Sequence, residues 1–271
     1  MQNTATARLL NSKNPALDAR HAIRRGAHTT HTGGVAPGHV QANMVILPAE
    51  YAQEFQTFCL LNPKPCPLLA VGEVGDPSLP TLGDDLDLRT DLAGYRVFEN
   101  GREIDVTSDI SSYWRDDLVS FPLGCSLSFE EALMQHGVPL YHRERNGRPA
   151  TYITNIETTP AGRFHGRMVV SMRAMSAADA IRAIQITTRF PNVHGAPVHI
   201  GDPEAIGIDD LDVQVFDGSP PQMREYDVPV FWACGITPQV VIETVKPSFC
   251  ITHLPGHMLV TDLLNTELAI L

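Results

Sequence analysis

Length, composition and charge narrow the function classes before any motif is considered. The chain has 271 residues, 43% of them hydrophobic and 19% charged, which is typical of a folded globular protein and not of a disordered one. It carries 20 basic against 31 acidic residues, a formal net charge of −11. Because phosphate contacts dominate nucleic-acid affinity, this balance argues against DNA, RNA and anionic membranes as partners. A small anionic substrate stays open, since a local cluster of donors can outweigh the net charge.

The cysteines and the first residues predict a cytoplasmic protein. The five cysteines are an odd number and include no Cys-x-x-Cys pair, so reduced thiols are the simplest interpretation. Residues 1–8 lack the apolar core of a secretion signal, and nothing approaches the ~18 apolar residues of a membrane span. We therefore expect a cytoplasmic location.

The first half of the chain predicts two helices, a strand, a hairpin and an acidic loop. Proline marks both helix starts, and an Asn-Gly dipeptide marks the hairpin turn. In chain order we expect a helix from Asn14-Pro15 to about Gly26, a helix from Pro48 to Leu61, a strand at Leu68–Val71, a solvated loop over Asp84–Asp91 and a hairpin over Tyr95–Asp105 that turns at Asn100-Gly101.

Three later segments repeat one pattern, an apolar strand, a short loop and a helix start. The strands are 118–121, 168–172 and 228–234, and the predicted caps are Ser128 with Glu131, Ser176 with Asp179, and Thr237 before Pro238. Strict alternation of strand and helix is absent, which disfavours a purely doubly wound sheet. We expect an α+β fold with mixed sheets and helices, arranged as two interleaved lobes of a single catalytic unit over residues 1–271, with the site between strand–helix junctions.

Two of these helix starts carry a cysteine in the preceding loop, Cys125 and Cys234. A helix N-terminus binds anions and can lower the pKa of a nearby thiol, so either cysteine could act as nucleophile or acid. The alternative is that both are small buried apolar residues beside glycine. Ser126 is the better candidate to face a ligand, whereas Ser128 is expected to cap its helix.

Histidines form the second group of candidates. His194 and His199 stand in one glycine-punctuated stretch, and His253 and His257 in another, where Pro255-Gly256 prevents the helical spacing of zinc ligands. Histidine supplies acid–base chemistry near neutral pH, and a structural hydrogen bond is the alternative. We predict no cofactor; a divalent metal held by these histidines and Asp202 stays open.

Arg173 is informative because cations are scarce in the second half of the chain. It follows a strand and precedes a helix start, where its planar fork could bind a substrate carboxylate; a salt bridge within the protein is the alternative. The sequence contains no GxxxxGK[ST], GxGxxG or GxSxG string, so the common nucleotide cradles and the hydrolase elbow are not indicated.

Seven longer motifs run in order from near residue 15 to the C-terminus. They are Gln41–Pro48, Phe58–Pro67, Gly124–Glu130, Val169–Arg173, His194–Pro203, Pro229–Gln239 and Ile251–His257. Together they resemble the putative hydro-lyase family related to D-glutamate cyclase. The resemblance implies a lyase, and its best-defined activity is the dehydration of D-glutamate to 5-oxo-D-proline. The chain departs from the family pattern at Ile153, where a basic residue is expected, and over residues 212–218.

The implied reaction gives these residues hypothetical roles. Cyclising glutamate needs a base for the ammonium, donors for a tetrahedral oxyanion and an acid for the leaving oxygen. His199 or His253 would be the base, Asp202 would orient a histidine, and amides near Cys125 and Ser126 would be the oxyanion donors. The expected substrate-binding residues are Arg173, Asn155, His194, Cys234, Gly235, Thr237 and His257.

Two other functions stay open. One is hydration or dehydration of another small carboxylic acid. The other is a non-catalytic protein that binds oxoproline-like ligands. A symmetric homo-oligomer is compatible with either function.

Overall fold

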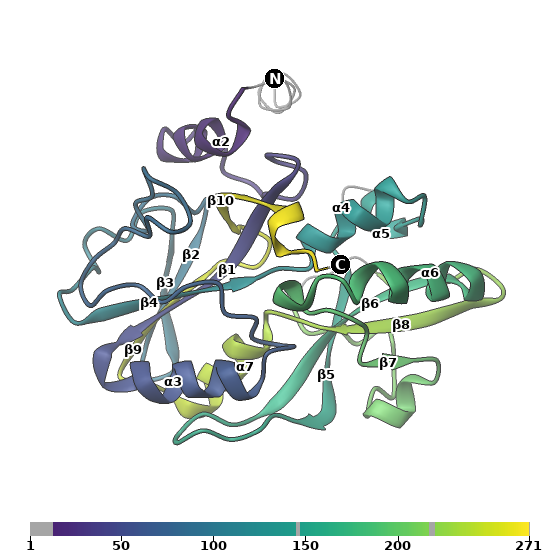
Figure 1. Ribbon diagram of the computed structural model, residues 1–271. Helices are drawn as coiled ribbons and strands as arrows, with labels where there is room; N and C mark the ends of the chain where they lie inside the picture. Colours follow the sequence, from purple (N-terminus) through teal and green to yellow (C-terminus); the bar gives the residue numbers. More distant parts are fainter. Residues whose placement is uncertain (1–12, 145–146, 217–219, 271) are drawn as a thin grey trace.

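Two antiparallel sheets with helices packed against them form the fold in this computed structural model, which describes residues 13–144, 147–216 and 220–270 (Figure 1). The arrangement confirms the predicted α+β class. The first sheet contains β1 (His39–Pro48), β2 (Tyr95–Glu99), β3 (Arg102–Thr107), β4 (Leu118–Gly124), β9 (Phe249–His253) and β10 (Leu259–Leu264), and the second contains β5 (Ala150–Glu157), β6 (Arg167–Ser176), β7 (His199–Ile200) and β8 (Asp227–Ala233). The helices are α2 (Pro15–Arg24), α3 (Ala49–Leu61), α4 (Leu127–Gln135), α5 (Tyr141–Glu144), α6 (Ala177–Thr187) and α7 (Thr237–Val245), with short 3-10 turns η1 (Pro191–Val193), η2 (Pro203–Ile206) and η3 (Asn265–Leu268).

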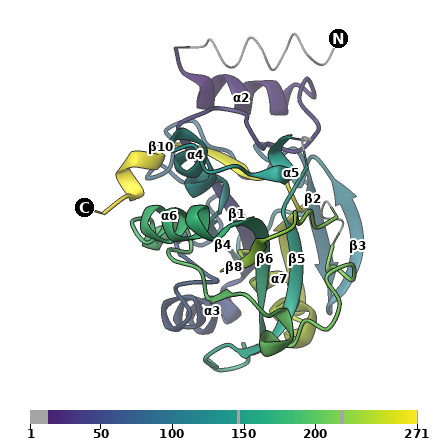
Figure 2. The same cartoon turned by 90° about the vertical axis from the view of Figure 1, so that its right-hand side faces the viewer.

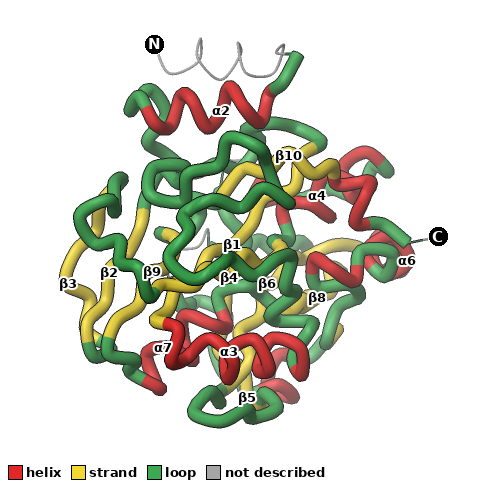
Figure 3. Tube along the Cα trace, turned by 60° about the vertical axis from the view of Figure 1, so that its left-hand side comes forward, coloured by secondary structure: helices red, strands yellow, loops and turns green. Residues whose placement is uncertain are grey.

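The chain interleaves the two sheets, as predicted. It builds the first sheet with β1–β4, forms the second with β5–β8, and returns to the first with β9 and β10. The strand order is β10-β1-β9-β2-β3 in the first sheet, with β4 also paired to β1, and β5-β6-β8-β7 in the second. Figure 3 shows β3, β2 and β9 side by side, away from β6 and β8. The segments before and after the second sheet therefore meet again in the first.

Apolar faces determine which helix covers which sheet. A cluster that includes Phe55, Phe58 and Ile242 packs α3 and α7 on the first sheet, and α7 also contacts β6 of the second sheet. α4 and α6 pack against the second sheet around the fully buried Trp232, and the two helices lie together on one side of the molecule (Figure 2). None of the helices in the described part of the chain has both the length and the apolar character that crossing a membrane requires.

Local signals predict several elements correctly. Asn14 caps α2 by accepting the Leu17 N–H at 3.2 Å. Ser176 caps α6 by accepting the Asp179 N–H at 3.1 Å, and the hairpin β2–β3 turns at residues 100–101. The predicted strand at 68–71 is wrong, because that segment makes only a single bridge, Leu68 to Leu123.

The caps predicted at Ser128 and Thr237 are also wrong. Thr237 is the first residue of α7, and Ile236 occupies the N-cap position without a side-chain cap. α4 begins at Leu127, and Ser126 occupies the N-cap position. The Ser128 hydroxyl has no hydrogen-bond partner among the described residues. Glu131 instead accepts the Gly38 N–H at 2.9 Å and the Asn265 amide at 2.6 Å. Ser128 and Glu131 therefore do not form a capping box, and Glu131 instead bonds residues distant in sequence.

The acidic loop at 84–91 is not simply solvated. Arg20 of α2 is fully buried and bonds Asp85 at 2.5 Å and Asp262 at 2.8 Å. Arg24 pairs with Asp91, which is fully buried as well. The carboxylates neutralise these arginines, because a buried charge without a partner strongly destabilises the fold. These ion pairs fasten α2 above β10, at one end of the molecule (Figures 1 and 2).

Candidate active site

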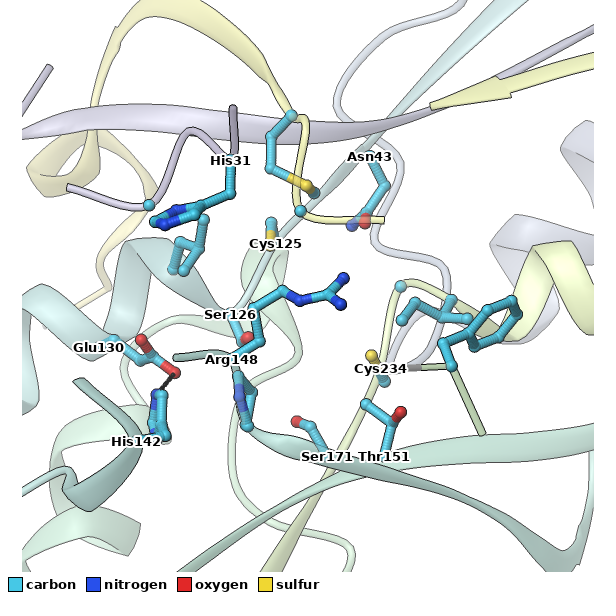
Figure 4. Close-up of a pocket in the computed structure, with 18 of the residues that line it drawn as sticks. His31, Asn43, Cys125, Ser126, Glu130, His142, Arg148, Thr151, Ser171 and Cys234 are labelled. Atoms are coloured by element: carbon cyan, nitrogen blue, oxygen red, sulfur yellow. Dashed lines mark hydrogen bonds and ion pairs between the residues drawn. The ribbon is translucent and has the colours of Figure 1, made fainter. Parts of the chain in front are cut away.

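A pocket opens where β4 and β8 end and α4 and α7 begin (Figure 4). Its empty volume is about 760 Å³, solvent at the mouth included. Both sheets supply lining residues: Asn43 and His253 come from the first, and Thr151 and Ser171 from the second. The pocket therefore lies between strand–helix junctions, where the sequence predicts the site.

Cys125 and Cys234 occupy equivalent places in this pocket, each directly before a helix start. The backbone N–H of Leu127 acts to lower the pKa of Cys125, and that of Ile236 acts to lower the pKa of Cys234. Burial nevertheless raises the pKa of Cys125 to about 12 and also raises the pKa of Cys234. Both groups are protonated thiols at neutral pH, contrary to the lowered pKa expected at a helix N-terminus, because desolvation outweighs the helix dipole here.

Asn43, in the middle of β1, links the two cysteine-bearing junctions. Its Nδ2 donates to the Gly124 carbonyl at 2.9 Å. The same nitrogen faces Gly235 so closely that a Cβ at that position would lie 2.0 Å away. Gly235 is therefore required by close approach, and its backbone borders the pocket at the start of α7.

Arg173 has its carboxylate partner within the protein. Its Nε lies 3.1 Å and its Nη2 2.5 Å from Glu130 Oε1, and both side chains are 1% exposed. Nη1 donates to Ser171 Oγ at 2.9 Å, and Nη2 donates also to Ser126 Oγ at 3.0 Å. The internal salt bridge is thus the correct alternative. Arg173 lies behind the pocket wall and positions Glu130, Ser126 and Ser171.

Glu130 is the acidic residue among the described groups lining the pocket. His142 Nε2 lies 3.0 Å from the same oxygen that Arg173 binds (Figure 4). Burial alone would raise the pKa of the Glu130 carboxyl, but Arg173 and His142 hold it well below its usual range. Glu130 is therefore a buried, ionised carboxylate at neutral pH.

His194 and His253 line the pocket with their imidazoles in neutral form, since burial lowers each pKa to about 4. His194 Nδ1 lies 2.6 Å from the Lys64 carbonyl, so it carries the proton and leaves Nε2 as an acceptor. At His253 the N–H groups of Met44 and Gln239 lie 3.2 and 3.3 Å from Nδ1, closer than the Met44 carbonyl at 3.4 Å. That nitrogen therefore accepts, and Nε2 carries the proton.

The structure brings half of the predicted site residues together. Those lining the pocket are Cys125, Ser126, His194, Cys234, Gly235 and His253. Those outside it are Arg173, Asn155, His199, Asp202, Thr237 and His257.

The residues outside the pocket have identifiable structural surroundings. His199 pairs with Phe231 in the sheet and shares its face, opposite to the face of Arg173 and Trp232. Its Nε2 contacts the Asp202 backbone carbonyl at 2.6 Å, while the Asp202 side chain caps η2. The proposed His–Asp pair therefore does not reach the pocket, and Asp202 does not orient the ring through its carboxylate.

The other three predicted site residues outside the pocket are Thr237, Asn155 and His257. Thr237 is buried and donates to the Cys234 carbonyl at 2.8 Å, and Asn155 is exposed. His257 lines an outer hollow that shares Arg148 with the pocket. Ile153, at one departure from the family pattern, is 37% exposed and does not line the pocket.

The second departure, residues 212–218, is described only in part. Asp217 and Gly218 lie outside the described residues, while Phe216 lines the pocket.

Sequence reasoning missed several charged lining residues, chiefly Glu130, His142, Arg143 and Arg148. Glu130 follows Ser126 by one helical turn and so shares its face, a spacing that could have revealed it. The basic run at 141–148 was a second available signal. Within the described ranges, no group of three or more His, Cys, Asp or Glu side chains lies close enough to hold a metal ion.

Comparisons with known proteins give one consistent result. The family model described as D-glutamate cyclase matches residues 119–262. A protein named "Putative hydro-lyase" from Verminephrobacter eiseniae is 57% identical over 93% of this chain and 91% of its own length. One of the same description from Bordetella pertussis is 58% identical over 93% and 90%. A solved nitrogen repressor-like protein from Methanococcus jannaschii aligns over 88% of this chain and 91% of its own, at 11% identity and a TM-score of 0.37, too weak for an argument.

Proposed function

The chain belongs to the D-glutamate cyclase family and is a lyase, and from this premise we propose that it dehydrates D-glutamate to 5-oxo-D-proline. The observation that carries the proposal is the charge inside the pocket. Among the described residues that line the pocket, two are arginines, Arg143 and Arg148, and one is acidic, Glu130. The chain as a whole has a net charge of −11. A locally positive pocket in an acidic protein fits a dicarboxylate.

The pocket offers anion-binding groups on two sides. The Arg148 guanidinium extends toward the middle of the pocket (Figure 4). At the start of α7 the Thr237 and Gln239 N–H groups already donate to the Cys234 and Ile236 carbonyls. The backbone N–H groups that would bind an anion and stabilise a developing oxyanion are therefore those of Ser126 and Gly235, just before α4 and α7. One carboxylate would lie against arginine and the other at the helix starts. Since both sheets supply these groups, we propose that they act as a single catalytic unit.

The reaction joins the α-nitrogen to the carbon of the γ-carboxyl group, Cδ, and breaks one of the two carbon–oxygen bonds of that carboxyl group. The ammonium loses two protons in total, and the departing oxygen leaves as water with both. His194 Nε2, as an acceptor, would take the two protons from the nitrogen one after the other and deliver each to the departing oxygen. The neutral His253 would keep its Nε2 proton and hydrogen-bond the departing oxygen, and the amides around Ser126 and Gly235 would hold the tetrahedral oxyanion. His194 thus replaces His199 as the proposed base.

The test is incubation of the purified full-length chain with D-glutamate, with product separated by chiral chromatography. We expect 5-oxo-D-proline, with L-glutamate and 2-hydroxyglutarate unchanged. Water loss from the hydroxy acid instead would indicate a different hydro-lyase. Thermal stabilisation by 5-oxoproline without any turnover would indicate a binding protein. A parallel chelator-treated sample tests whether a divalent metal is required.

A further inference from the structure

The two carboxylate oxygens of Glu130 have very different surroundings. Oε1 receives Arg173 at 2.5 Å and His142 at 3.0 Å. Oε2 is buried and has no hydrogen-bond partner within the part of the chain that the structure describes. Figure 4 shows it on the opposite side of the carboxylate from His142. One oxygen of a buried, ionised carboxylate therefore remains without a donor.

A buried acceptor without a donor is costly, and a charged one more so. Arg143 Nε lies 3.8 Å from Oε2, too far for a hydrogen bond. Glu130 lines the pocket, so a bound ligand is the candidate to supply the donor once the side chains that cover this oxygen move aside. Such a ligand would carry an N–H or O–H donor.

Charge selects among such donors. An ammonium group supplies both the hydrogen bond and the positive charge that an ionised carboxylate binds most strongly. An α-amino acid also carries a carboxylate one carbon away from its ammonium. Oε2 and Arg143 present the complementary pair, an anionic acceptor and a cation 3.8 Å apart. The two groups together match the zwitterionic head of an amino acid.

We propose that Glu130 Oε2 binds the ammonium group of an α-amino-acid substrate and that Arg143 binds its α-carboxylate. The inference rests on the proposed function for the identity of the pocket as the substrate site. It adds the source of selectivity for amino acids over carboxylic acids that lack the amine. Glu130 would hold the nitrogen in place without keeping its proton, which passes to another base.

The first experiment needs no variant. Binding of D-glutamate and of glutarate to the full-length protein is measured by calorimetry under the same conditions. Glutarate keeps both carboxylates and lacks the amine. We expect glutarate to bind about 10- to 100-fold more weakly, the range for a hydrogen bond to a charged group. Equal or tighter binding of glutarate would show that a water molecule, and not an ammonium, completes Oε2, and would overturn the inference.

The second experiment changes the acceptor itself. In Glu130→Gln the amide oxygen can still accept from Arg173 and His142, while the amide NH₂ replaces Oε2 and faces the ligand. We expect D-glutamate affinity to fall to that of glutarate, with glutarate affinity changed by less than about threefold. Glu131→Gln is the matched control, since Glu131 contacts Gly38 and Asn265 and should leave both affinities unchanged.

The outcomes separate this inference from the proposed function. Turnover of D-glutamate with unaltered affinity in Glu130→Gln would overturn the inference and leave the function standing. Amine-dependent binding without turnover would support the inference and contradict the function. Absence of binding by both ligands together with absence of turnover would contradict both. If Glu130→Gln fails to fold, the comparison of D-glutamate with glutarate on the unaltered protein still decides.

Discussion

At the scale of single residues, two buried imidazoles set the protonation state of the pocket. His194 and His253 are each 1% exposed, and their neutral forms present an acceptor and a donor respectively. The proposed reaction needs one of each. Since burial is the main cause of both lowered pKa values, a change in stability with pH should report the same burial.

Stability should therefore fall between about pH 6.5 and pH 4. In this window the unfolded chain binds protons at histidines whose folded pKa is lowered to about 4. Above pH 6.5 these two histidines do not make the free energy of unfolding depend on pH. Below pH 4 their destabilising effect no longer increases. Each contributes a slope of up to about 1.4 kcal/mol per pH unit. Urea unfolding across the window measures it.

The variant His194→Asn should remove the contribution of His194, about half of what the two buried histidines add to the slope of stability against pH. The exposed His165 serves as the control site, and His165→Asn should leave the slope as it is in the unaltered protein. An unchanged slope in His194→Asn would show that this imidazole is not held neutral by burial.

At the scale of elements, the two strand–cysteine–helix junctions depend on one contact from β1. Asn43 bonds the end of β4 through the Gly124 carbonyl and abuts Gly235 at the start of α7. The relative placement of the two helix starts depends on the close approach of Asn43 to Gly235. The placement of the proposed oxyanion donors depends on it as well. A displacement of about 1 Å in such a site costs on the order of 100-fold in rate.

Gly235→Ala should accordingly lower kcat/KM for D-glutamate by about 100-fold, because the new Cβ would lie 2.0 Å from Asn43 Nδ2. In the double variant with Asn43→Ala the clash disappears. We expect the double variant to be more active than Gly235→Ala alone, a positive coupling in a double-mutant cycle. Strictly additive losses in kcat/KM would show that the two residues do not share this contact.

At the scale of the whole molecule, caps and turns in the sequence predict helices and strands, whereas the pairing of distant strands determines which residues line the site. The Asn14 cap, the Ser176 cap and the turn at Asn100-Gly101 all depend on residues close in sequence, and all are confirmed. The partner of Arg173 and the face occupied by His199 depend on which strands pair, which periodicity does not reveal. The same reason explains the acidic loop, whose carboxylates meet arginines of α2 from a distant part of the chain.

The charge distribution also belongs to this scale. The protein as a whole is strongly acidic, whereas the described pocket lining carries Arg143 and Arg148 against Glu130. The arginines of the pocket lining favour an anionic substrate despite the acidic net charge, so selectivity depends on a few groups.

The measurement that tests the central claim most directly is ¹⁵N NMR of [¹⁵N]D-glutamate incubated with the full-length protein. Cyclisation keeps the nitrogen and releases an oxygen. We predict that the ammonium signal is replaced by a lactam amide signal, at a rate proportional to protein concentration, without free ammonium ion. Release of ammonium ion, or a D-glutamate signal that stays unchanged over many protein equivalents, would contradict the account.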